Sequence, residues 1–181
     1  MMAISPEGYT IDGKFYRRVS SLLKEYGLIP AYRENGYSME FGTHIHKACE
    51  LWDKGTLDID NLDPALRPYV NEYIKFTMHD VAVDLTTHIE HLFVSKKYGF
   101  AGRVDRIIFH NIYDLKTGKP SDWHGVQLAM YKILARENKV KIDKCHALYL
   151  TATGHKVQAY NEQKYMAVAL AILTIKNYKE K

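Results

Sequence analysis

Two aspartates and a lysine, Asp105, Asp114 and Lys116, are the residues of this chain most suited to chemistry. They lie in a stretch, residues 101–117, in which two runs of mostly apolar or β-branched residues flank His110-Asn111. That pattern predicts a β-hairpin whose two-residue turn is His110-Asn111. The carboxylates and the amine would then lie on neighbouring strands.

The register of this hairpin decides which side chains meet. A turn at His110-Asn111 would pair Phe109 with Ile112, Ile107 with Asp114 and Asp105 with Lys116. Side chains alternate along a strand and paired residues share a face, so the two aspartates and Lys116 should point the same way. The opposite, buried face should carry Val104, Ile108, Tyr113 and Leu115.

Two carboxylates at this spacing favour a bound cation. On a sheet diagonal they would lie roughly 7–8 Å apart, and like charges that close raise one another's pKa unless a cation lies between them. Hard oxygen ligands suit Mg²⁺ or Mn²⁺. A surface hairpin with an ordinary Asp–Lys pair fits the same spacing, so the hairpin alone leaves both interpretations open.

A second group of polar residues precedes the hairpin on a helix predicted over residues 40–53. Gly42, His46 and Glu50 are four residues apart and therefore share one flank of that helix, whereas His44 projects from the other flank. Gly42 removes bulk where the helix could approach another backbone. His46 could be a metal ligand or simply a half-exposed helix histidine.

A third group follows the hairpin on a helix predicted over residues 122–137. Gln127 and Tyr131 are again four apart, at the edge of its apolar face. An amide and a phenol are suited to holding a phosphate or stacking on a base. Taken alone, the pair is better explained as a plain polar flank of the helix.

The remaining elements predict a sheet with helices packed on it, an α/β or α+β fold rather than a TIM barrel or a helical bundle. In chain order we expect a short helix over 22–26, the 40–53 helix, a helix from Pro64 to about Met78, an extended segment over 85–98, the hairpin, the 122–137 helix, strands over 145–152 and 155–160, and a closing helix over 162–178.

Composition sets broad limits. The chain has 181 residues, 46% hydrophobic and 25% charged, with a net charge of +4, which is ordinary for a globular domain and compatible with a polyanionic partner. We find no secretory signal and no apolar run long enough to span a membrane. Cys49 and Cys145 form no CxxC unit and are expected to be buried thiols in a reducing compartment, so we expect a cytoplasmic protein.

Four motifs in order resemble those of a known family: Gly-x3-His-x3-Glu (42–50), Gly-Arg-Val-Asp-Arg (102–106), Asp-Leu-Lys-Thr-Gly (114–118) and Gln-x3-Tyr (127–131). The set is similar to the PD-(D/E)XK nuclease superfamily, and more narrowly to its RecB-type exonuclease branch, which includes small phage and mitochondrial members. The resemblance implies an α/β, restriction-endonuclease-like core, a central mixed β-sheet flanked by α-helices. It also implies a single nuclease domain over residues 1–181, with a motif-bearing core of about 40–160.

The resemblance also assigns roles. It implies that one or two Mg²⁺ or Mn²⁺ ions are held by a set of ligands made up of His46, Asp105, Asp114 and the Leu115 carbonyl. Lys116 would orient or deprotonate the attacking water, and Gln127 and Tyr131 would support the site and contact the DNA strand. Glu90 and Glu50 are further acidic candidates. The four cysteines that hold an iron–sulfur cluster in some relatives are absent, so no cluster is implied.

The implied substrate is DNA, and the basic residues near the motifs are its expected phosphate contacts. Arg103, Arg106 and Lys119 flank the site, while Lys96-Lys97 fit surface charge equally well. The function expected is that of a metal-dependent DNA exonuclease, working with a replication or recombination partner if a motor is needed. The alternatives are a non-cleaving module that binds DNA ends and a structure-specific endonuclease. Polarity, strand preference, DNA over RNA and oligomeric state stay open.

Overall fold

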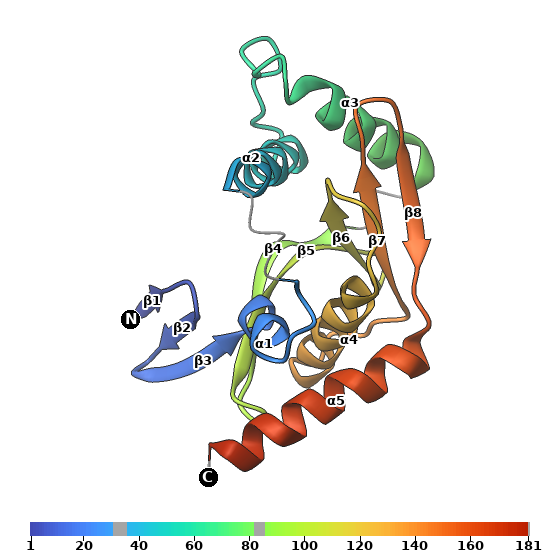
Figure 1. The fold of residues 1–181 in the computed structure, drawn as a ribbon. Helices are drawn as coiled ribbons and strands as arrows, with labels where there is room; N and C mark the ends of the chain where they lie inside the picture. Colours follow the sequence, from blue (N-terminus) through green and yellow to red (C-terminus); the bar gives the residue numbers. More distant parts are fainter. Residues whose placement is uncertain (31–35, 82–85, 181) are drawn as a thin grey trace.

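A mixed sheet flanked by helices forms the protein, as the sequence predicts (Figure 1). The computed structural model describes residues 1–30, 36–81 and 86–180. The strands are β1 (Met2–Ile4), β2 (Gly8–Ile11), β3 (Lys14–Arg18), β4 (Thr86–Ser95), β5 (Phe100–Ile108), β6 (Asn111–Lys116), β7 (Lys144–Leu150) and β8 (His155–Ala159). The helices are α1 (Val19–Glu25), α2 (Gly36–Asp53), α3 (Arg67–Lys75), the π-helical turn η2 (Phe76–Asp80), α4 (Asp122–Glu137) and α5 (Glu162–Lys179).

Within the described residues the sheet has eight strands, in the order β1-β2-β3-β5-β6-β7-β8, with β4 paired to β5 outside this path. Neighbouring strands are antiparallel except for β3–β5 and β6–β7. Parallel strands need a crossover connection, and α4 makes it between β6 and β7. The carboxyl end of β6 therefore lies next to the beginning of α4, where crevices form in sheets of this kind.

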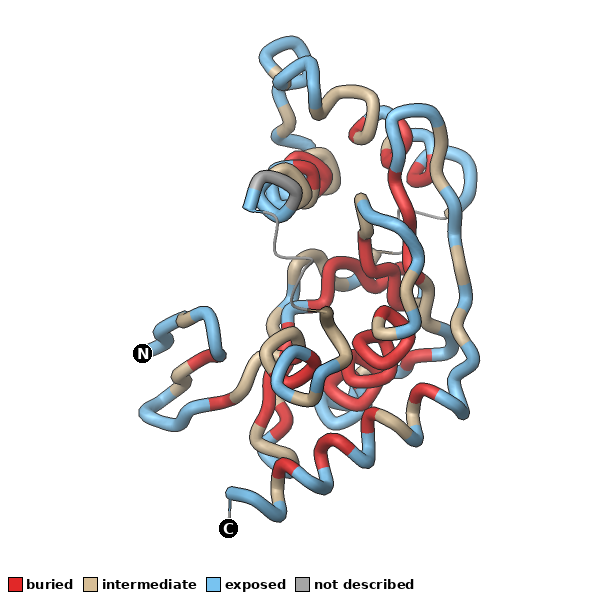
Figure 2. Tube along the Cα trace, viewed as in Figure 1, coloured by how far each residue is buried: buried red, intermediate tan, exposed pale blue. Residues whose placement is uncertain are grey.

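Helices cover both faces of the central strands (Figures 1 and 2). Apolar residues of α1, α4 and α5 form one core cluster with the sheet, and those of α2 and α3 form a second. Val104 belongs to the first cluster, while Ile108, Tyr113 and Leu115 belong to the second. The expectation that these four side chains are buried is confirmed. The expectation that they share one buried face is wrong, because the strands are buried on both sides.

The β5–β6 hairpin turns one residue earlier than predicted. Its turn is Phe109-His110, with φ values of 42° and 62°, and Ile107 pairs with Ile112. Positive φ at both central residues is the geometry of tight hairpin turns, and the paired isoleucines both enter the first core cluster. The register predicted from a turn at His110-Asn111 is therefore wrong by two residues. A two-residue shift preserves the side-chain alternation, so the faces of Asp105 and Asp114 are unchanged.

Most helices match their predicted positions. The 122–137 helix has the expected bounds, and α2 begins earlier than expected but ends before Gly55, whose φ is 66°. The helix expected from Pro64 to about Met78 begins later, at Arg67, and passes into the π-helical turn η2 after Lys75. No helix in the described ranges is both long and apolar enough to cross a membrane.

Candidate active site

The candidate site lies where β5 and β6 separate. Their paired residues run from Ile108–Asn111 to Arg106–Tyr113. Beyond this pairing a side chain takes the place of the backbone acceptor: the Leu115 N–H donates a 2.7 Å hydrogen bond to the Asp105 carboxylate. Strand β6 continues along β7 on its other side. Asp105 thus fills the opening between the two strands and is buried there.

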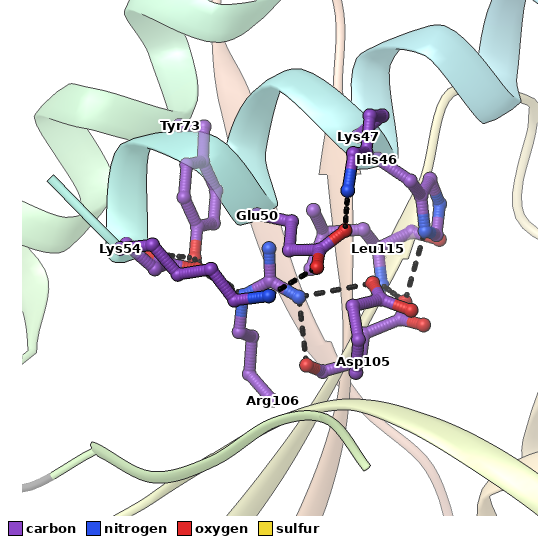
Figure 3. A network of polar contacts seen from close by, with 10 residues as sticks. His46, Lys47, Glu50, Lys54, Tyr73, Asp105, Arg106 and Leu115 are labelled. Atoms are coloured by element: carbon purple, nitrogen blue, oxygen red, sulfur yellow. Dashed lines mark hydrogen bonds and ion pairs between the residues drawn. The ribbon is translucent and has the colours of Figure 1, made fainter. Parts of the chain in front are cut away.

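Helix α2 brings His46 to this opening (Figure 3). A side chain at Gly42 would approach the Thr117 hydroxyl to 3.2 Å, so glycine lets the helix pack closely on the end of β6. His46 Nε2 donates 3.1 Å to the Leu115 carbonyl, and Nδ1 lies 3.4 Å from Asp105 Oδ2. Burial lowers the pKa of His46, but Asp105 raises it more, and the net shift is upward.

Glu90 reaches the same place from β4. Its backbone has a φ of 48°, unusual for a strand residue other than glycine. Ligand atoms of His46, Glu90 and Asp105 all lie within 4.8 Å of one another. Burial and then the Asp105 charge raise the pKa of Glu90. Such a group of an imidazole and two carboxylates has the composition of a cation site.

Asp114 and Lys116 stand beside this group at the end of β6. Asp114 is 1% exposed, and its Oδ2 lies 2.5 Å from Lys116 Nζ. Burial raises the pKa of Asp114 to about 6, although Lys116 opposes the shift. Asp105 differs, because its neighbours His46, Lys116 and Arg106 outweigh the effect of burial and hold its pKa at about 2. Two nearby carboxyl groups thus have very different proton affinities.

Helix α4 fixes the lysine through a chain of hydrogen bonds. Lys116 Nζ donates 3.0 Å to Gln127 Oε1, and Gln127 Nε2 donates 2.9 Å to the Tyr131 hydroxyl. Tyr131 fits because residue 102 is glycine: a Cβ there would lie 2.8 Å from the tyrosine ring. Two of the four motifs therefore meet at this packing contact.

Part of this group borders a cavity of about 480 Å³. His46, Glu90 and Lys116 line it, together with the loop after β6, and so do Trp123 and His124 at the start of α4. The sequence reasoning missed the last two as site residues. Trp123 precedes Gln127 by one helical turn, a spacing that places both on one flank of α4 and could have pointed to it. Lys116 Nζ lies 5.5 Å from the Trp123 ring centre.

The residues present fit a divalent cation. Carboxylates and a backbone carbonyl, the ligand types that suit Mg²⁺ and Mn²⁺, converge here beside an imidazole. Asp114 is buried, and within the described residues its Oδ2 contacts a cation at Lys116 Nζ, 2.5 Å away. A buried carboxylate oxygen of this kind favours an additional positive charge.

Three of the expected roles do not match the structure. Arg106 is fully buried, which contradicts its expected contact with DNA phosphates. Tyr131 is 7% exposed and packed in the core, which contradicts its expected contact with the DNA strand. Glu50 pairs with Lys47 and Lys54, whose hydrogen bonds lower its pKa to about 2, rather than joining the other acidic groups.

The other basic candidates are exposed. Arg103 is the exposed residue of β5, and Lys119 is exposed in the loop that lines the cavity. Lys96 and Lys97 are exposed in the turn before β5. At about 3.3 Å per residue, that turn is well over 10 Å along the strand from Asp105, so we do not place these two lysines at the site.

Comparison with known proteins identifies the family. A family model of the PD-(D/E)XK nuclease superfamily matches residues 14–176. The chain belongs to the PD-(D/E)XK nuclease superfamily. Among solved structures, this nuclease-family chain is similar to a Eubacterium rectale protein described as a "putative exonuclease", with a TM-score of 0.57 and 15% sequence identity over 91% of this chain and 79% of the other. At that identity the likeness shows the fold alone. Curated proteins gave no significant match.

Proposed function

We propose that this PD-(D/E)XK protein is a metal-dependent DNA exonuclease of the RecB type. The observation that carries the proposal is the pairing of two buried aspartates with cavity-lining residues: Asp105 contacts His46, and Asp114 contacts Lys116. The proposed ligands of Mg²⁺ or Mn²⁺ are His46, Asp105, Asp114 and the Leu115 carbonyl. Glu90 joins them because its carboxylate lies in the same group.

The chain's own residues would prepare the hydrolysis. A bound divalent cation supplies activation of water and neutralisation of charge on the phosphate. Lys116 has three N–H donors; two face Asp114 and Gln127, so the third can hold the attacking water or a phosphate oxygen at the cavity that Lys116 lines. Gln127 and Tyr131 act as positioning residues, because they hold the Lys116 amine in place but do not line the cavity themselves.

The proposed substrate contacts are electrostatic. Arg103 and Lys119 are exposed and would bind the DNA backbone, which makes binding salt-sensitive and little dependent on sequence. We further propose one nuclease domain over the whole chain, a cytoplasmic location in keeping with the free thiols of Cys49 and Cys145, and a replication or recombination partner where a motor is required.

A cleavage assay tests this proposal. Labelled linear DNA is incubated with Mg²⁺ or Mn²⁺ and wild-type protein, Asp114→Ala or Lys116→Ala, with Glu50→Gln as a matched control outside the ligand group. We expect nucleotide release by wild type and the control only, and none in chelator. Equal release by all four proteins would contradict the assignment. DNA binding without cleavage under either metal would favour a non-cleaving end-binding module, and nicking of closed circular DNA would favour an endonuclease.

A further inference from the structure

Arg106, which follows the site aspartate Asp105 directly, is fully buried. A guanidinium keeps its charge when buried and must therefore be paired. Its Nη1 donates 2.7 Å to the Asp105 carbonyl and 3.1 Å to Glu90 Oε1. One nitrogen thus contacts the backbone of one acidic site residue and the carboxylate of another.

The opposite side of Arg106 is anchored to the helices above the sheet (Figure 3). Arg106 Nε donates to Asp53, the last residue of α2, and 3.0 Å to the Tyr73 hydroxyl on α3. Tyr73 in turn donates 2.8 Å to the Asp53 carboxylate. Tyr73 and the side chain of Asp53 are themselves buried, so the guanidinium is held in one orientation from behind.

Glu90 needs such a partner. Its φ of 48° is a left-handed backbone conformation that costs on the order of 1 kcal/mol for a non-glycine residue, and it persists only where surrounding contacts hold it. A carboxylate has about four lone-pair positions, so Glu90 can accept from Arg106 and still ligate a cation. The positive charge also offsets repulsion between Glu90 and Asp105, which lie in one group.

We propose that Arg106, anchored by Asp53 and Tyr73, is a positioning residue that holds Glu90 and Asp105 in the arrangement that binds the cation, and so sets the affinity for metal. The inference rests on the proposed function, because it concerns the same site. It replaces the contact with DNA expected for Arg106. Groups that orient metal ligands from behind typically change metal affinity about 10–100-fold when they are altered.

Metal binding without DNA tests this proposal. Mn²⁺ binding is measured by calorimetry and by electron paramagnetic resonance of free Mn²⁺, with thermal unfolding in parallel. The variants are Arg106→Lys, which keeps the charge and loses the fork, Asp53→Asn, and the milder Tyr73→Phe. We expect Mn²⁺ dissociation constants raised about 10–100-fold for the first two variants and severalfold for the third.

Two controls separate this role from general stability. Lys132→Met removes another buried cation, 2% exposed and paired with Glu162 at 2.7 Å. Tyr165→Phe removes the hydroxyl of another buried tyrosine, which donates 2.9 Å to Asp122. Both controls should lower the unfolding temperature and leave the dissociation constant for Mn²⁺ within about twofold of wild type, because neither residue contacts Glu90 or Asp105.

The outcomes are decisive for each claim. Wild-type affinity in folded Arg106→Lys and Asp53→Asn would overturn this inference alone, as would equal losses in the two controls. If those two variants do not fold, Tyr73→Phe decides, and wild-type affinity in that variant would overturn the inference. A wild-type protein without measurable Mn²⁺ binding would overturn the proposed function and this inference with it.

Discussion

Gly102→Ala should damage the site from a distance. A Cβ at position 102 would lie 2.8 Å from Tyr131 Cε1, 2.8 Å from Val19 Cγ2 and 3.0 Å from Leu134 Cδ1. All three neighbours are buried, so the crowding cannot be relieved into solvent. The tyrosine ring must move, and its hydroxyl holds Gln127, which holds Lys116.

The size of the effect follows from this packing. Overpacking a core costs about 1–3 kcal/mol of unfolding free energy. Three contacts at or below 3.0 Å place this substitution near the middle, about 2 kcal/mol. For a domain of this length that is an unfolding temperature lower by about 4–8 °C. A displacement of about 1 Å at a catalytic group can cost about 100-fold in rate, so we expect kcat to fall about 10–100-fold while KM for DNA changes little.

The assay pairs steady-state cleavage with thermal unfolding, and Gly125→Ala is the matched control. A Cβ there would lie 2.6 Å from the Tyr165 ring, between α4 and α5. It should destabilise the fold to a similar extent and leave kcat near the wild-type value. A Gly102→Ala protein that is destabilised but retains wild-type kcat would refute the hydrogen-bonded chain to Lys116, as would equal kcat losses in both variants.

Three further predictions concern charged groups that are exposed or partly buried. Arg103→Ala and Lys119→Ala should each reduce the slope of log affinity for DNA against log salt by about 1, measured by fluorescence anisotropy; an unchanged slope would exclude a phosphate contact. Glu50→Gln should leave Mn²⁺ affinity within about twofold, because Glu50 pairs with lysines; a large loss would make it a ligand. His155 lies 2.6 Å from Asp80 and 3.2 Å from Glu72, near Lys75, and although burial lowers its pKa, these carboxylates raise it above 6.5. The pairing of His155 therefore stabilises the fold fully below about pH 6.5 and less as the pH rises through the raised pKa. The difference in unfolding temperature between wild type and His155→Gln should then be larger near pH 6 than near pH 9. An equal difference at the two pH values would contradict this.

The motif residues could be found from the sequence because local spacing places them. Alternation along the strands put Asp105 and Asp114 on one face even though the predicted turn was wrong, since a shift of two residues keeps the parity. The four-residue spacing of Gly42 and His46 placed both on the flank of α2 that meets β6. The α/β fold followed from the order of the elements.

What could not be predicted depends on contacts between distant segments. The burial of Arg106 on β5 depends on Asp53 and Tyr73, which helices α2 and α3 bring to it, and nothing next to Arg106 in sequence indicates them. Glu90 was a candidate from the resemblance alone, and nothing near it in the sequence indicated that its carboxylate lies within 4.8 Å of ligand atoms of Asp105 and His46. The N-terminal strands β1–β3 are short, three to five residues, and only the Asp12-Gly13 turn between the second and third could have indicated them.

The most direct test of the central claim is a crystal of the protein soaked in Mn²⁺, with the ion located by its anomalous scattering. We expect a peak in contact with the carboxylates of Asp105 and Asp114 and next to His46, at the cavity that Lys116 lines. A peak elsewhere, or none at a saturating concentration of Mn²⁺, would contradict the claim that these residues hold a catalytic metal.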